Sequence, residues 1–252
     1  MSNYQRNTSL VICIFAVLVI GAVGIGLISY YGTDTMNWNT NPATTDFSFE
    51  AETGAINETV TLDIDIASGA VSIVFVDDES LLYDIDVTVQ NTTIETEGDP
   101  TVTFTSNTIG LSYPAAAVNL TLGSGVNYTL DIDVLSGVVN VVLGLGAHIG
   151  DVSIDTTSGV ITLDMTDDAV VFGNATFDLT TTSGLITINV DYPTSIEGSI
   201  ECAVVSGTVG ITATGWTEIT SNHYESSDYD DASQTLTIIA QTTSGVISAT
   251  IT

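Results

Sequence analysis

The sequence predicts an all-β fold, a repeated-strand β-solenoid (β-helix-like) ectodomain, behind one N-terminal transmembrane α-helix. Two observations predict the solenoid: a Ser-Gly pair recurs six times, and apolar residues alternate with polar ones around each pair. The third observation is a run of 19 uncharged residues near the start of the chain. The expected domains are 1–9, a short cytoplasmic N-terminus; 10–31, a transmembrane signal anchor; 32–46, a polar linker; and 47–252, the ectodomain.

The composition is strongly acidic. The 252 residues include 31 Asp and Glu but a single basic residue, Arg6, so the formal net charge is −30. Such a surface repels nucleic-acid phosphates, and nucleic acid is not an expected partner. Cations and partners with basic faces are attracted instead, although the same charge also serves solubility alone. An apolar content of 44% in alternating order predicts a folded chain rather than a disordered one.

The uncharged run has the length of a membrane span. As a helix, Leu10–Ile28 would be about 28 Å long, close to the hydrocarbon thickness of a bilayer. Tyr30 and Tyr31 follow it at the level that aromatic rings prefer, and Arg6 precedes it, which predicts a cytoplasmic N-terminus and an extracellular C-terminal domain. We therefore expect a single-pass protein of the cell membrane, anchored by residues 10–31. A cleaved signal peptide is the alternative, although no small-x-small cleavage site is clear before Tyr30.

Each repeat consists of an alternating strand, a Ser-Gly pair and a second alternating strand. The six pairs begin at Ser68, Ser136, Ser158, Ser183, Ser206 and Ser244. The four consecutive copies from Ser136 to Ser206 are 22, 25 and 23 residues apart, and a period of this size indicates an array or solenoid. Gly tolerates a positive φ and a serine hydroxyl can satisfy a nearby backbone group, so we interpret the pair as a corner of the chain. Six equivalent serines without a matching His are not expected to be catalytic.

The residues two, four and six positions after each Gly are apolar, which predicts that they fill the core. They are Val71, Ile73, Phe75, Val139, Val141, Leu143, Ile161, Leu163, Met165, Ile186, Ile188, Val190, Val209, Ile211, Ala213, Ile247, Ala249 and Ile251. The strands before the pairs have inward sets of their own, such as Ile200, Cys202 and Val204, so Cys202 is expected to be a packed core cysteine. Its only counterpart, Cys13, lies in the apolar N-terminal run, and no disulfide between them is expected.

Strand, Ser-Gly, strand units in series resemble the putative adhesin family, whose head-like repeated β-solenoid domain has no assigned function. The resemblance covers roughly Asn57 to Thr252 and is carried by the six Ser-Gly units. It implies a membrane or envelope setting and offers no catalytic residues to transfer. Family members often have an acidic residue directly after the Ser-Gly pair. This chain instead has Ala70, Val138, Val160, Leu185, Thr208 and Val246 there.

Pairs of Asp residues two positions apart lie on predicted strands and therefore share the outward face. There are three such pairs: Asp63 and Asp65, Asp84 and Asp86, and Asp131 and Asp133. If the strands stack, the carboxylates line up, and hard oxygen ligands without a neighbouring Lys suit Ca²⁺. Ca²⁺ is the only cofactor that the sequence suggests. A loop with the same chemistry contains Asp228, Asp230 and Asp231. The alternative interpretation of both groups is a solvated acidic surface.

An enzymatic function is not expected. The two histidines, His148 and His223, are too few for a His-based metal site, and His223 near Glu225 is most simply a surface loop residue. Solenoid enzymes that cleave acidic polysaccharides use basic residues to hold the substrate, and the predicted ectodomain has none. Five N-glycosylation sequons lie outside the predicted anchor. They begin at Asn57, Asn91, Asn119, Asn127 and Asn174.

The sequence thus predicts a membrane-anchored extracellular adhesin-like or envelope structural module, with a glycan or a cell-surface protein as its ligand. The last repeat ends at the C-terminus, so an uncovered last strand there is expected to offer an edge for self-association. The alternative functions are the subunit of a surface filament joined through that edge and, less favoured, a glycan-processing β-helix enzyme.

Overall fold

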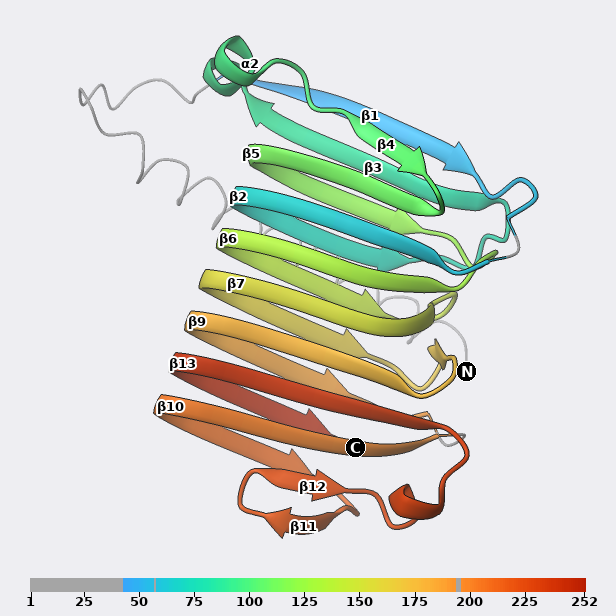
Figure 1. Cartoon of the computed structure of the whole chain (residues 1–252), viewed down its shortest axis with the longest axis vertical. Coiled ribbons are helices and arrows are strands. Elements are labelled where there is room, and N and C mark those ends of the chain that lie inside the picture. Colours follow the sequence, from blue (N-terminus) through green and yellow to red (C-terminus); the bar gives the residue numbers. More distant parts are fainter. Residues whose placement is uncertain (1–42, 57, 194–195) are drawn as a thin grey trace, which may run out of the picture. The chain divides into compact units, whose positions relative to one another are not determined.

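The computed structural model describes residues 43–252 except 57, 194 and 195 (Figure 1). Strands account for 71% of the structure and helices for 4%, which confirms the all-β prediction. The predicted anchor at residues 10–31, Cys13, the sequon at Asn57 and most of the predicted linker lie outside the described residues. Within the described ranges, no helix has the length and apolar character needed to cross a membrane.

The first strand begins at Thr44, inside the segment predicted to be a linker. The strands are β1 (Thr44–Glu52), β2 (Val60–Phe75), β3 (Leu81–Gln90), β4 (Val102–Thr105), β5 (Thr108–Leu122), β6 (Tyr128–Leu143), β7 (His148–Met165), β8 (Val170–Val171), β9 (Ala175–Val190), β10 (Glu197–Ala213), β11 (Thr217–Thr220), β12 (His223–Glu225) and β13 (Thr235–Ile251). Two short helices, α2 (Asn91–Glu97) and η1 (Tyr229–Asp231), were not predicted because neither is long enough to show helical periodicity.

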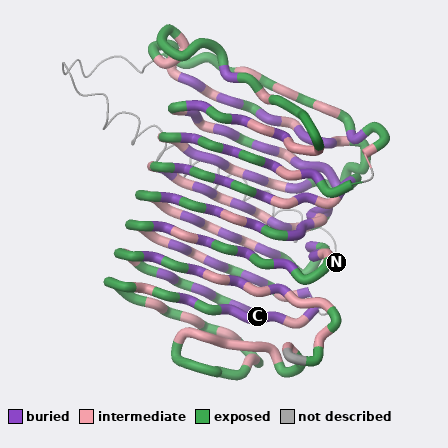
Figure 2. Tube along the Cα trace, in the orientation of Figure 1, coloured by how far each residue is buried: buried purple, intermediate pink, exposed green. Residues whose placement is uncertain are grey.

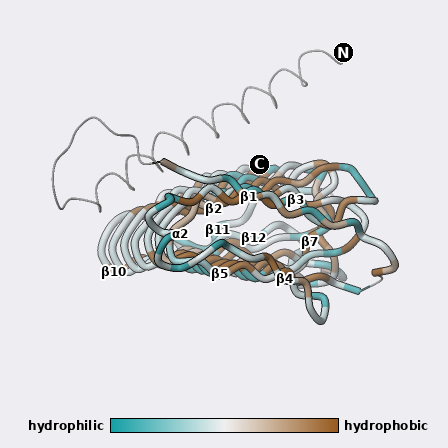
Figure 3. The backbone as a smooth tube through the Cα atoms, turned by 90° about the horizontal axis from the view of Figure 1, so that it is seen from above, coloured by the Kyte–Doolittle hydropathy of each residue, from teal (hydrophilic) through white to brown (hydrophobic). Residues whose placement is uncertain are grey.

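The described strands form one 13-stranded sheet in the order β1-β3-β5-β2-β6-β7-β9-β13-β10-β12-β11, with β4 beside β5 and β8 beside β7. Seven long strands, which we call rungs, pair in parallel from β5 to β10. Each rung folds back on itself, so its first half and its second half lie in two layers, as seen along the stack in Figure 3. The core lies between these layers.

The Ser-Gly pairs of the rungs are in register with one another. Ser68 pairs with Ser136, Ser136 with Ser158, Ser158 with Ser183, Ser183 with Ser244, and Ser244 with Ser206. The pairs lie near the middle of the long strands, between the two halves of each rung, and the strand pairing continues on both sides of them.

The prediction that the C-terminal repeat leaves the open edge is wrong. β13 lies between β9 and β10, in parallel with both, so the C-terminal strand is an interior rung. The expectation assumed that consecutive repeats are neighbours in space. Instead, β11, β12 and η1 carry the chain back past β10 before β13 begins. The open edge among the described rungs is therefore the second half of β10.

The sequence did not predict β5 as a seventh rung, because β5 lacks the Ser-Gly pair. On β5, Ala115 and Ala116 lie beside Ser68 and Gly69 of β2. β5 is the first rung of the stack, and β3 pairs with its second half only from Ala117 onward. Nothing therefore stacks against Ala116 from the other side, and a side chain is tolerated there.

The glycine of each pair is required by the distance between neighbouring rungs. A Cβ added at Gly137, Gly159 or Gly184 would lie 1.8–2.1 Å from the carbonyl oxygen of the glycine on the preceding rung. Gly69 and Gly207 have φ of 155° and 148°, whereas the other four pair glycines do not have a positive φ. The predicted reason, conformational freedom alone, is therefore incomplete, because close backbone approach applies to all six glycines.

The predicted inward residues do fill the core, as the alternating burial in Figure 2 shows. All of them are buried except Val204, Val209, Ile211 and Ala213. These four are partly buried because their rung, β10, is the last one. Tyr128 is the largest fully buried side chain; its hydroxyl donates to the Leu82 carbonyl at 2.6 Å. Each buried Leu or Ile side chain contributes about 1.5–3 kcal/mol, so this repetitive core is the main source of stability.

Candidate functional site

Two of the three predicted Asp pairs line up along the outward face of the first rung halves. The third pair does not join them, because Asp84 and Asp86 lie on β3, beside Thr121 and Asn119 in the second half of β5. Asp63 lies beside Asp131, and Asp65 lies beside Asp133. The next rung continues the column, because Asp133 pairs with Asp155. We call the outward side of the first halves the acidic face. Its exposed carboxylates are those of Asp63, Asp65, Asp131, Asp133, Asp151, Asp155, Asp178 and Glu201.

Partial burial and neighbouring carboxylates of the acidic face raise the pKa of two of these groups, Asp133 and Asp155. Partial burial raises the pKa of Asp133, and the carboxylates of Asp131, Asp65 and Asp63 raise it further, in that order. Partial burial also raises the pKa of Asp155, with Asp133 as the next cause. No Lys or Arg follows Arg6 in the sequence. The acidic face therefore carries uncompensated negative charge.

The calcium hypothesis receives no geometric support from the described residues. In this part of the chain, no three His, Cys, Asp or Glu side chains are placed so that they could hold a metal ion. Asp228 precedes the short helix η1 and Asp231 is its last residue, and both are exposed. The side chain of Asp230 lies outside the described part. Calcium binding by Asp63, Asp65, Asp131, Asp133 or the η1 loop stays a prediction.

The opposite face has a different chemistry. The second halves of the seven rungs, from the residue after the Gly position to the sixth, contain one acidic residue, Asp164, whose carboxylate accepts a hydrogen bond from Asn189 at 2.7 Å. The residues directly after the Gly are aliphatic on most rungs, and Val246 is 43% exposed. We call this side the neutral face. Sequence reasoning missed the contrast because it treated the two outward faces alike.

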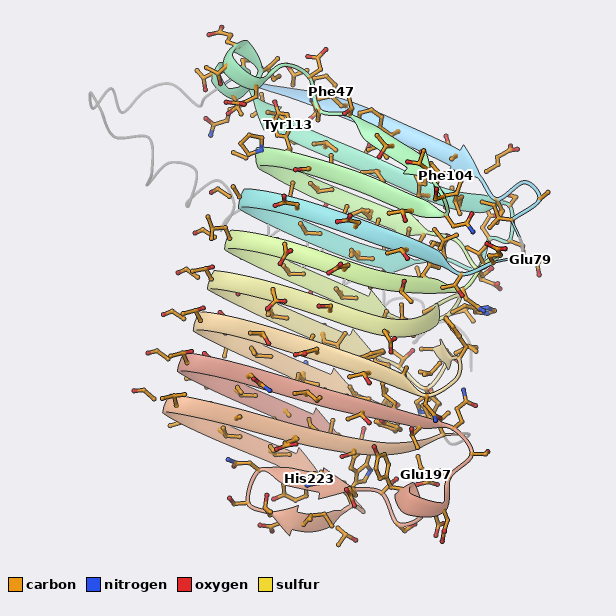
Figure 4. The ribbon with its side chains drawn as sticks, viewed as in Figure 1. Phe47, Glu79, Phe104, Tyr113, Glu197 and His223 are labelled. Carbon is orange, nitrogen blue, oxygen red and sulfur yellow. The ribbon has the colours of Figure 1, made fainter. Side chains whose placement is uncertain are left out.

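His223 joins the hairpin of β11 and β12 to the last rung (Figure 4). Its Nε2 lies 3.0 Å from the Ser199 hydroxyl and 3.0 Å from Oε1 of Glu225. Both partners share one ring nitrogen and Ser199 is 4% exposed. A catalytic triad needs the serine and the acid on different nitrogens and the serine open to substrate. The cluster therefore fastens the hairpin and is not arranged for catalysis.

A cavity of about 460 Å³ lies among the loops that join the rungs on the side away from the Ser-Gly bends. Its lining includes Glu58, Glu79, Asn127 and His148. The Glu58 carboxylate already accepts a hydrogen bond from Asn107 at 2.6 Å. The volume would admit a small molecule, and the lining is polar.

Four of the five predicted sequon asparagines lie in the described residues. Asn91 and Asn174 are exposed at the start of α2 and in the loop before β9, and Asn119 is exposed on β5. Asn127 is half-buried and lines the cavity. Glycosylation of these sites stays a prediction.

Cys202 is buried and free, as the sequence predicted. Burial raises the pKa of its thiol to about 12, and the neighbouring Glu201 carboxylate adds to the effect. The thiolate is the reactive form of cysteine, so Cys202 is chemically inert in the folded protein.

Comparisons with known proteins find a family model and solved structures to which parts or most of the chain are similar. Residues 147–249 match the family model described as "Cell wall-active antibiotics response LiaF, C-terminal". A solved structure, described as a putative cell adhesion protein from Clostridium sporogenes, has a TM-score of 0.69 at 14% identity, covering 83% of this chain and 100% of that one. No curated protein matches the chain.

Two further solved structures are each described as a putative adhesin, from Bacteroides fragilis and Parabacteroides merdae. Their identities are 11% and 9%, they cover 84% of this chain and 98% and 97% of their own, and their TM-scores are 0.29 and 0.28. Scores at this level support no argument. The Clostridium sporogenes protein shows that the fold as a whole occurs in a protein described as adhesive.

Proposed function

We propose that the chain is a membrane-anchored, extracellular β-solenoid that acts as an adhesin-like binding module without catalytic activity. The observation that carries the proposal is the pair of broad, regular outward faces, one acidic and one neutral, on a rigid stack of rungs. Recognition would then rest on outward side chains spread over several rungs, rather than on a single deep site. Such flat surfaces suit extended ligands, glycan chains or proteins, better than small molecules.

The comparisons support the same reading. The fold neighbour is described as a cell adhesion protein, and the matching family model names a response to cell wall-active antibiotics. The uncharged run at residues 10–28 supports an anchor, with the folded part outside the cell. The charge distribution supports different roles for the two faces. An anionic envelope polymer would be repelled by the acidic face and could approach only the neutral face.

An array of glycans and envelope polymers, scored both for binding and for cleavage, tests the proposal. The full chain in a mild detergent is expected to bind a subset of ligands and to leave all of them uncut. A matched variant with Val160→Asp and Thr187→Asp on the neutral face should lose binding to anionic ligands. Turnover of any ligand would contradict the non-catalytic proposal, and no binding at all would point to a purely structural role.

A further inference from the structure

The stack of rungs ends unevenly at β10. The first half of β10 is covered, because Ser199–Glu201 pair with β12, and β12 pairs with β11. The second half, Ser206–Ala213, pairs with β13 on one side and with no strand on the other among the described residues. Val205 nearby is 83% exposed. Within the described residues, the second half of β10 therefore leaves backbone N–H and C=O groups without a strand partner on that side. It also leaves the last apolar layer of the described core without a covering strand.

The other strand edges in the described part carry features that prevent pairing. β1 has Asp46, Glu50 and Glu52 within nine residues. β4 and β11 have only four residues each, and β11 has a register shift between Glu218 and Thr220. Charges, shortness and irregularity are the usual protections of an edge strand. The second half of β10 has no charge, no Pro and no register shift.

The glycine column specifies what could be added to this edge. At every step of the stack, a Cβ on the pair glycine would collide with the carbonyl oxygen of the glycine before it; at Gly207 the distance to the Gly245 oxygen would be 1.8 Å. A strand that continued the stack past β10 would face the Gly207 carbonyl in the same way. It would therefore need a glycine abreast of Gly207.

We propose that the second half of β10 binds an extended strand of another protein, parallel to Ser206–Ala213 and with a glycine abreast of Gly207. The strand would be uncharged and apolar at alternate positions, so that it covers Val209 and Ile211, as in other cases of strand addition. Lys or Arg on its flanks would be attracted, because the surrounding chain has a net charge of −30. The inference concerns an edge and stands apart from the proposed function of the two faces.

A second copy of the chain is a poorer occupant. The Ser-Gly strands β2, β6, β7, β9 and β13 each have a rung on both sides, so none is available to a neighbour. Two copies meeting at β10 would also have to accommodate β11 and β12, which continue the other layer beyond β10 in each copy (Figure 1). A separate strand meets neither obstacle.

The probe is a synthetic peptide with the sequence of residues 244–251, SGVISATI, flanked by two lysines at each end and labelled with a fluorophore. This strand lies beside β10 in the structure and has glycine at the required position. Binding to the full chain in detergent is measured by fluorescence anisotropy, and we expect a dissociation constant of about 10 μM. The same peptide with Gly245→Ala should bind at least about tenfold more weakly because its Cβ meets the Gly207 carbonyl.

Two further measurements locate the peptide. Hydrogen exchange should show new protection at Ser206–Ala213 and none at β1. Ile211→Lys, which points a charge into the open end, should abolish binding, whereas Ile219→Lys on the exposed β11 should not. Three results would overturn the proposal. They are equal affinity of the two peptides, new protection at β1 or β11, and dimerisation of the chain that depends on its concentration and is inhibited by the peptide. The comparison of the glycine and alanine peptides uses the unaltered chain. It therefore tests the proposal even if the Ile211→Lys variant does not fold.

Discussion

At the scale of single residues, the acidic face costs stability at neutral pH. Burial and neighbouring carboxylates raise the pKa of Asp133 in the folded chain above its ordinary value of 3.8. A raised pKa means that the folded chain binds this proton more tightly than the unfolded chain does. Protonation therefore stabilises the fold as the pH falls through the folded pKa, and this contribution is absent at neutral pH.

Asp133→Asn removes a charge from the middle of the column and should raise the free energy of unfolding at pH 7 by about 0.5 kcal/mol, the scale of a like-charge pair across strands. The gain should shrink as the pH falls below about 4, where the carboxylates of the wild type become protonated. Urea unfolding at several pH values measures it. Asp168→Asn, in an exposed loop, is the control and should have no comparable effect. A gain that persisted unchanged at low pH would show that charge is not the cause.

Three buried threonines occupy one inward position on neighbouring rungs. Thr156 lies beside Thr181, and Thr181 lies beside Thr242. The Thr156 hydroxyl donates to the Thr181 hydroxyl at 2.9 Å, but the Thr242 hydroxyl has no hydrogen-bond partner in the described structure. The next rung has Val204 at this position, so an aliphatic side chain fits there.

Thr242→Val should therefore stabilise the chain by about 1 kcal/mol, because a buried hydroxyl without a partner is replaced by a methyl group of similar shape. Thr156→Val is the matched control. It breaks a hydrogen bond and should destabilise the chain by about 1 kcal/mol. Thermal unfolding followed by circular dichroism distinguishes the two. Destabilisation by both variants would indicate that Thr242 has a partner, such as a buried water.

At the scale of the structural element, the spacing of the rungs depends on the glycine of the Ser-Gly pair. Gly159→Ala would place a Cβ 2.1 Å from the Gly137 oxygen and should destabilise the chain by about 3 kcal/mol. Gly210→Ala is the control on another strand, where an added Cβ meets nothing within 4 Å; it should be neutral or stabilising by about 0.5 kcal/mol. Chemical denaturation measures both. Similar losses at the two positions would contradict the close-approach argument.

The sequence predicts elements well where the two-residue period is strong and poorly where order in space differs from order in the chain. Ile161, Leu163 and Met165 are buried as predicted, because alternation encodes the inward face directly. The insertion of β13 between β9 and β10 could not be predicted, because nearly identical strands fit either slot. Of the candidate site, the alignment of Asp63 with Asp131 followed from the repeat. The Ser199–His223 contact did not, because it depends on the return of the hairpin.

At the scale of the whole molecule, the charge of −30 makes stability depend on the ionic environment. Exposed carboxylates that repel one another are screened by salt, with a Debye length of about 10 Å at 0.1 M ionic strength. CaCl₂ supplies the same screening as NaCl at equal ionic strength, so an effect of screening alone is similar for the two salts.

The melting temperature should therefore rise with NaCl and with CaCl₂ to a similar extent when ionic strength is matched. Differential scanning calorimetry makes the comparison, with MgCl₂ as a second divalent control. A rise specific to calcium, lost in the double variant Asp131→Asn and Asp133→Asn, would instead establish the predicted calcium site on the acidic face.

The proposed binding module acts outside the cell, so its function requires that the stack of rungs is extracellular. The most direct measurement is antibody staining of intact cells that produce the full chain with an epitope after Thr252, beside staining of permeabilised cells and a cytoplasmic marker. We expect intact cells to stain for the epitope and not for the marker. Staining that appears only after permeabilisation would place the domain inside the cell and rule out an extracellular binding module.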